Sequence, residues 1–171
     1  MITRSLKYVV AVAVAGAILA APAALAKDKS DLDKVPKTVM DSLKGKFPKA
    51  EIQKWTKEKE GGLVVYDIEF KQDGRKFEAD IKEDGTIHNW EKAIAAKDLP
   101  DAVRKAVDTK YPKSKLEEIM EITAVTDGKD ALEGYEIVLE TADKNEVEVM
   151  VAPDGKILEE SGAGEEELEE E

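Results

Sequence analysis

The sequence predicts an α+β protein that is a tandem repeat of two units, each a helix followed by a four-stranded antiparallel meander, with the helices on one sheet face. The first observation is a repeated stretch. Residues 35–49 return 64 positions later as 99–113, with the same apolar–Pro start and apolar residues four apart. The second is a change of spacing, because downstream of each copy apolar and polar residues alternate, as they do in strands. A repeat of this kind governs the whole fold.

The first 26 residues have the pattern of a secretory signal peptide. Arg4 and Lys7 give a positive start, an apolar run spans 8–20, and the segment ends in Ala24-Leu25-Ala26. We expect cleavage after Ala26, a periplasmic or secreted product, and no membrane attachment afterwards. The apolar run is shorter than the roughly 20 residues that a membrane span needs, so an uncleaved anchor is the less favoured alternative.

Composition excludes several classes of function. The chain has no Cys, which excludes a disulfide framework, a Cys-ligated metal, a Cys nucleophile and a lipid anchor on Cys. The net charge is −12, and loss of Arg4 and Lys7 with the signal peptide would make it −14. Residues 159–171 contain eight Glu and no cation. Such a chain disfavours nucleic acid and anionic lipid, and it favours cationic or neutral partners.

Each unit is expected to begin with a helix of about three turns. Residues 27–34 before the first helix are charged and are expected to be a flexible lead-in. Pro36 and Pro100 suit the first turn of a helix, where the missing N–H costs nothing. The apolar stripes recur every four residues and stop before a proline, at Val35, Val39, Leu43 and Phe47, and at Leu99, Val103, Val107 and Tyr111.

Strands are expected after each helix. The first unit, 35–92, has strand patterns from Ile52, over 64–70, over 77–81 and from Ile87. The second unit, 99–160, has them over 116–122, 135–139 and 147–151, and from Ile157. Asp-Gly pairs supply the positive φ of tight hairpins, and they occur at 73–74, 84–85, 127–128 and 154–155. Residues 93–98 are the expected linker, and 161–171 an acidic tail that should be disordered.

These features resemble the PepSY-like proteins, an exported bacterial group also described as β-lactamase-inhibitor-like. The resemblance rests on the signal peptide, the paired helix-then-meander units, the Lys-aromatic-Pro helix ends and the Asp-Gly before the last strand. It covers about residues 33–160. It implies an α+β architecture in the periplasm or outside the cell, and binding or inhibition, with peptidases as the target class, rather than catalysis. It offers no catalytic residues to carry over.

No constellation of residues indicates catalysis or a cofactor. His88 is the only His, whereas a catalytic triad needs a nucleophile and an orienting acid beside it. A zinc site needs further N or S ligands. The loop at Asp127-Gly128 lacks the alternating acids of an EF-hand. We therefore expect no enzyme, no cofactor and no metal site, and we interpret His88 as a strand residue on a solvent face.

The sheet surface away from the helices is expected to keep large apolar side chains. Taking Val64, Tyr66, Phe77 and Ile87 as inward, the outward set is Trp55, Val65, His88, Trp90, Ile119, Val138, Met150 and Leu158. Acidic residues share this outward parity, namely Asp67, Glu69, Glu78, Asp80 and Glu148. Apolar groups rimmed by charge resemble a partner-binding surface. The alternative is that the other unit or a dimer partner covers them.

The sequence thus predicts a non-catalytic exported protein that binds or inhibits a protein or peptide through the open sheet face. Trp55 and Trp90 are the expected anchors, because aromatic residues dominate interface energetics. One alternative is a low-affinity cation-binding or cation-sensing protein that uses its acidic surface and tail. Another is a hydrolase, which no nucleophile–base pair supports. The sequence leaves open the partner's identity, the oligomeric state and whether the two units share one sheet.

Overall fold

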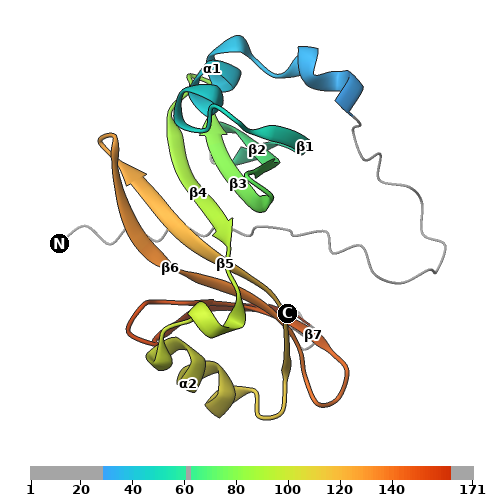
Figure 1. Cartoon of the computed structure of the whole chain (residues 1–171), viewed down its shortest axis with the longest axis vertical. Coiled ribbons are helices and arrows are strands. Elements are labelled where there is room, and N and C mark those ends of the chain that lie inside the picture. Colours follow the sequence, from blue (N-terminus) through green and yellow to red (C-terminus); the bar gives the residue numbers. More distant parts are fainter. Residues whose placement is uncertain (1–28, 61–62, 163–171) are drawn as a thin grey trace, which may run out of the picture.

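The computed structural model describes residues 29–60 and 63–162, and its strands form one eight-stranded antiparallel sheet in sequence order (Figure 1). The strands are β1 Glu51–Glu60, β2 Leu63–Gln72, β3 Arg75–Lys82, β4 Ile87–Ala93, β5 Lys115–Thr126, β6 Lys129–Glu140, β7 Glu146–Val151 and β8 Ile157–Gly162. The helices are the 3-10 helix η1 Lys29–Lys34, α1 Lys37–Lys46, the 3-10 helix η2 Ala96–Asp98 and α2 Asp101–Lys110.

The predicted fold class, two tandem units that each combine a helix with a four-stranded meander, is wrong. β4 pairs with β5, from Asn89 opposite Ala124 to Ala93 opposite Met120, so the strands form one continuous sheet. The described chain is mostly sheet, with two α-helices of ten residues each. The pairing of β4 with β5 satisfies two strand edges that would otherwise present unpaired N–H and C=O groups. Alternation within a strand does not reveal which edges meet.

Both α-helices start and stop at the residues that their sequences favour. α1 follows Pro36 and α2 follows Pro100. Each ends at an aromatic residue whose backbone N–H donates to the carbonyl four residues earlier, Phe47 to Leu43 at 2.7 Å and Tyr111 to Val107 at 2.8 Å. The proline that follows each aromatic residue prevents continuation of the helix.

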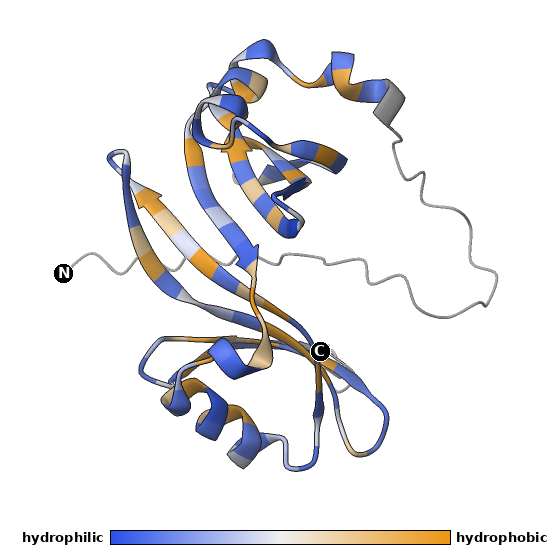
Figure 2. Cartoon of the chain, viewed as in Figure 1, coloured by the Kyte–Doolittle hydropathy of each residue, from blue (hydrophilic) through white to orange (hydrophobic). Residues whose placement is uncertain are grey.

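The two helices cover the same face of the sheet, which we call the helix face. Val39 and Leu43 of α1 are fully buried against β1–β4, and Val103 and Val107 of α2 are buried among residues of β5–β7. The register keeps this face continuous, because Trp90 on β4 lies opposite Thr123 on β5. Figure 2 shows the alternation of apolar and polar residues as orange and blue bands along the strands. No described helix covers the opposite side, which we call the open face.

The Asp-Gly turns at Gly85 and Gly155 pack against α1 and α2, and replacement of Gly155 tests this packing. Gly155 has φ +90°, and a Cβ there would lie 2.6 Å from the carbonyl oxygen of Ala102 in α2. We expect Gly155→Ala to lower the free energy of unfolding by roughly 2–4 kcal/mol, from backbone strain plus the clash. Gly128 has φ +73° but open space around it, so Gly128→Ala should cost only about 1 kcal/mol. Urea unfolding of both variants measures the difference, and equal losses would refute the packing argument.

Several predicted segments lie partly or wholly outside the described residues. The expected signal peptide, 1–26, lies outside them, and so do residues 163–171 of the expected acidic tail, 161–171. The first two residues of that tail, Ser161 and Gly162, end β8 instead. Residues 29–34 of the expected flexible lead-in form η1, whose Leu32 packs against the core under α1. The expected linker, 93–98, contains the last residue of β4 and the whole of η2. Within the described ranges no helix combines the length and apolarity that a membrane crossing requires.

Candidate functional site

The two tryptophans that the sequence placed on the outer surface lie on the helix face instead. Trp55 is 4% exposed, lies opposite Ile68 and packs beside Tyr66, with 6.2 Å between ring centroids. Trp90 lies opposite Ala79 and 5.7 Å from the ring of Phe47. Their predicted position on the outward face is therefore wrong.

The other outward candidates divide between the two faces. Ile119 lies opposite Ile137 and is buried in the core with α2, so its predicted outward position is also wrong. Val65, Val138 and Met150 do lie on the open face, where their cross-strand neighbours are charged. His88 lies within a register shift of β4, and Leu158 is 42% exposed on β8.

One physical cause explains all three misplaced residues. The register shifts between Ile52 and Lys54, between Asp80 and Ile81 opposite β4, and between Leu116 and Glu118. Each shift is a one-residue bulge, and a bulge moves every later residue of the strand to the other face. Trp55, Trp90 and Ile119 each follow such a bulge, so simple alternation assigns them to the wrong side.

The open face combines apolar residues with many carboxylates. Eight acidic residues line it across β2–β7, namely Asp67, Glu69, Glu78, Asp80, Glu91, Glu118, Glu136 and Glu148. The sequence analysis had placed Asp67, Glu69, Glu78, Asp80 and Glu148 on this side. It missed Glu91, Glu118 and Glu136. Alternation could have placed Glu136 there, because the strand pattern over 135–139 predicts Tyr135 and Ile137 on the inward face and successive side chains of a strand point to opposite faces.

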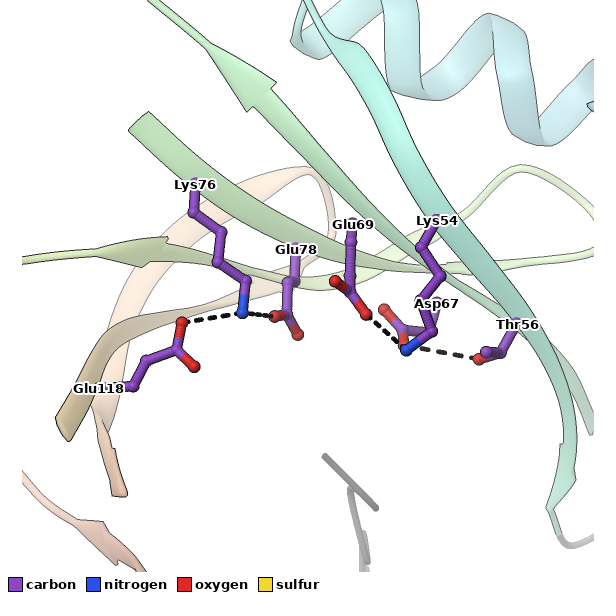
Figure 3. A network of polar contacts seen from close by, with 7 residues as sticks. All are labelled: Lys54, Thr56, Asp67, Glu69, Lys76, Glu78 and Glu118. Atoms are coloured by element: carbon purple, nitrogen blue, oxygen red, sulfur yellow. Dashed lines mark hydrogen bonds and ion pairs between the residues drawn. The ribbon is translucent and has the colours of Figure 1, made fainter. Parts of the chain in front are cut away.

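Two lysines at the margins neutralise part of this charge (Figure 3). Lys54 on β1 bonds to Glu69 at 2.8 Å. Lys76 on β3 bonds to Glu78 and, across β4, to Glu118 on β5, both at 2.8 Å. The Glu69, Glu78 and Glu118 side chains are 25%, 12% and 30% exposed. These ion pairs are therefore partly shielded from water and tie the strands of the open face together.

Several of these carboxylates also lie directly opposite one another on neighbouring strands, in addition to the partners that Glu69, Glu78 and Asp80 have. Asp67 lies directly opposite Asp80, and Glu78 lies directly opposite both Glu69 and Glu91. Like charges directly opposite in neighbouring strands destabilise a sheet. Such a local conflict with the fold is expected at functional sites, because elsewhere it brings no compensating gain.

Burial and mutual repulsion raise the pKa values of these carboxyls. Burial, followed by repulsion from Asp80, raises the pKa of Asp67 to about 8. Burial, followed by the charge of Glu136, raises the pKa of Glu91 well above its ordinary value. Burial, followed by the charge of Glu148, raises the pKa of Glu136 to about 8. A pKa of about 8 favours the protonated form of Asp67 and of Glu136 at neutral pH. Within the described chain, Asp67 Oδ1 has no hydrogen-bond partner.

The geometry of the open face fits binding better than metal chemistry. In residues 29–60 and 63–162, no three acidic or His side chains converge with the geometry of a metal site. A shallow pocket of about 360 Å³ opens next to the acids, between the end of β4 and β5–β6. Its lining mixes apolar and acidic groups, namely Ala93, Ile94, Glu117, Glu118, Ile119 and Val138. This surface can accept hydrogen bonds from a basic partner and can contact that partner's aliphatic groups.

Comparison with known proteins identifies the family. The model of a family described as beta-lactamase-inhibitor-like and PepSY-like matches residues 26–89 and 65–159. No curated protein matches the chain in sequence.

Solved structures share the fold at low sequence identity. A DUF2874 family protein from Bacteroides uniformis has TM-score 0.60 and 15% identity, covering 74% of this chain and 88% of that one. A BLIP-like protein from Bacteroides fragilis has TM-score 0.53 and 20% identity, covering 75% and 86%. A candidate periplasmic protein from Bacteroides eggerthii has TM-score 0.61 and 15% identity, covering 75% and 88%. At these identities, the similarity shows the fold alone.

Proposed function

Because the chain belongs to the PepSY-like, beta-lactamase-inhibitor-like family, we propose that it is an exported, non-catalytic protein that binds a protein or peptide partner through its open face. Export is supported by the signal-peptide pattern of residues 1–26 and by the description of the structural relative from Bacteroides eggerthii as a candidate periplasmic protein. The family description makes an exported enzyme, such as a peptidase or β-lactamase, the first class of partner to test.

The observation that carries the proposal is the set of facing carboxylates on a sheet surface that no described helix covers. Asp67 and Asp80, and Glu78 and Glu91, lie directly opposite each other at a cost to the sheet. A partner with basic side chains would remove this repulsion and satisfy the unpaired oxygen of Asp67. Charge complementarity of this kind provides specificity and accelerates association.

A pull-down from an extract of exported proteins tests the proposal. The bait is the mature chain, residues 27–171, compared with a Glu118→Gln/Glu148→Gln variant. Both of these carboxylates lie on the open face beside Val138. The matched control is Asp108→Asn/Glu133→Gln, which removes the same charge from exposed positions elsewhere.

We expect a basic partner that is retained by the native chain and the control, is reduced by about tenfold on the open-face variant, and is released by salt. Equal capture by all three baits would contradict binding through the open face. A calcium titration that shifts the melting temperature would instead favour the alternative of a cation-binding protein. No metal-type cluster in the described residues favours that alternative at present.

A further inference from the structure

Four carboxyl groups meet at the middle of the open face, on three neighbouring strands. We call Asp67, Glu78, Asp80 and Glu91 the central acid cluster. We infer that this cluster is a subsite for one arginine side chain of the partner, with Glu91 at its floor. The inference rests on the proposed function, since it names the chemical group that the same open face would recognise.

The environment of Glu91 indicates that a ligand is missing. Glu91 is only 6% exposed, and it lies between Glu78 on β3 and Ile122 on β5. Among the described residues, no hydrogen bond or ion pair joins the Glu91 carboxyl to a donor. The charges that act on it belong instead to other carboxyls, Glu136 first and then Glu78, Asp80 and Asp67. The same cluster contains Asp67 Oδ1, a buried oxygen without a hydrogen-bond partner in the described chain, so a donor supplied by a partner would satisfy a group that the described residues leave unpaired.

The protein's own cations leave this position unfilled. Lys54 is engaged by Glu69, and Lys76 is engaged by Glu78 and Glu118. Figure 3 shows Lys76 between Glu78, a member of the cluster, and Glu118, and it shows Lys54 bonded to Glu69. Neither forms an ion pair with Glu91 or Asp67 within the described chain. The centre therefore keeps an excess of carboxyl groups that a third cation can occupy.

The geometry favours a guanidinium over a metal ion or an ammonium. The described acids lack metal-site geometry. A guanidinium is planar, carries five donors in a rigid fork and is weakly hydrated, so it suits a buried site with carboxylates on several sides. An ammonium is a compact, strongly hydrated point charge.

Entry of a guanidinium would also move protons. Burial and neighbouring charges raise the pKa of Asp67 to about 8 and the pKa of Glu91 well above its ordinary value, which favours the protonated form of both carboxyls. A cation beside them favours the charged form, so binding should release protons to the buffer. The groups that face the cluster and set this balance are Glu69 on β2, Lys76 on β3, Glu136 on β6 and Lys54 on β1.

Isothermal titration calorimetry with synthetic peptides tests the subsite. A tetra-arginine peptide and a tetra-lysine peptide are titrated into the mature chain near neutral pH, in two buffers of different ionisation enthalpy. The variants are Glu91→Gln and, as the matched control, Glu133→Gln, an exposed acid on β6. Glu91→Gln removes the ionisable carboxyl and keeps the shape of the side chain, so the variant should fold, which circular dichroism verifies.

We expect the arginine peptide to bind about tenfold tighter than the lysine peptide, with net proton release. Glu91→Gln should weaken the arginine peptide by about tenfold and lower the proton release, whereas Glu133→Gln should change neither. Equal affinity for the two peptides, no peptide binding, or an unchanged Glu91→Gln would each overturn the subsite. The pull-down with the Glu118→Gln/Glu148→Gln variant tests binding through the open face separately. A positive pull-down together with a negative peptide titration would therefore support the open face as the binding surface and reject the arginine subsite.

Discussion

The folded protein is expected to lose stability as the pH rises from about 5 to about 8, which is the opposite of the usual behaviour of paired carboxylates. The reason is the group of buried acids on the open face. The pKa of Asp67 and of Glu136 is raised to about 8, chiefly by burial. In the unfolded chain, these carboxyls ionise near their ordinary values of 3.8 and 4.5. Their stabilising contribution is therefore fully present below about pH 4 and is lost as the pH rises through about 8.

The expected size of the effect is several kcal/mol. One group that stays protonated when folded and ionised when unfolded costs about 1.4 kcal/mol per pH unit. Over three pH units, the upper limit for Asp67 alone is about 4 kcal/mol. Paired acids act in the other direction at low pH. Hydrogen bonds lower the pKa of Asp84, Glu140 and Glu160, whose contributions are lost under acid conditions. The maximum of stability should then lie near pH 5.

Thermal unfolding followed by circular dichroism at about pH 5, 6.5 and 8 measures this dependence. The melting temperature should fall by roughly 10 °C between the two extremes. Glu136→Gln should flatten the curve and raise stability at the alkaline end, because an amide has no proton to lose. Glu133→Gln, at an exposed position, should leave the curve unchanged. A melting temperature that rises with pH in this range would show that the open-face acids are ionised in the folded protein.

Replacement of Trp55 is expected to destabilise the fold rather than to remove a binding anchor. The residue is 4% exposed, and its ring packs in the core beneath α1, beside Tyr66. Trp55→Ala should lower the free energy of unfolding by roughly 3–5 kcal/mol, from lost transfer energy plus the cavity. For a protein of this size, that is a large fraction of the total stability.

Val65→Ala provides the matched comparison, because Val65 is a partly buried residue of the open face. Its replacement should cost only about 1 kcal/mol. Urea unfolding of both variants gives the two values. If Trp55→Ala lowers the free energy of unfolding no more than Val65→Ala does, Trp55 is not a core residue, and its predicted role as a binding anchor would be supported again.

The sequence predicts the local elements well because local chemistry determines them. Pro36 and Pro100 mark the starts of the helices, and the Asp-Gly turns at Gly85 and Gly155 have the positive φ expected of them. The prediction fails where one inserted residue decides which face a side chain lies on, or where the pairing of two strand edges decides how the units join. The bulges opposite Phe70 and Ile81 reverse the faces of Trp55 and Trp90 without altering the alternation on either side of the bulge.

The candidate site shows the same limit. The acids of β2 and β3 could be assigned to one face because those strands pair in simple register from Val65 to Gln72. Glu91 could not, since it follows the bulge in β4 and reaches the open face only through it. Nor does the sequence show that β4 meets β5, which brings the charge of Glu136 to bear on Glu91. Burial and repulsion at this centre arise from tertiary structure alone.

The order of strands has a mechanical consequence. Because the strands are arranged in sequence order, the first strand, β1, and the last strand, β8, form the two opposite edges of the sheet. Tension applied to the chain ends would therefore peel off one edge strand at a time, breaking its hydrogen bonds in succession rather than all together in shear. In the described chain α1 and α2 brace the strands on the helix face only, and on the open face the bond from Lys76 to Glu118 spans β4. A ligand seated across several strands of the open face would act as a second brace and raise the force needed to unravel the protein.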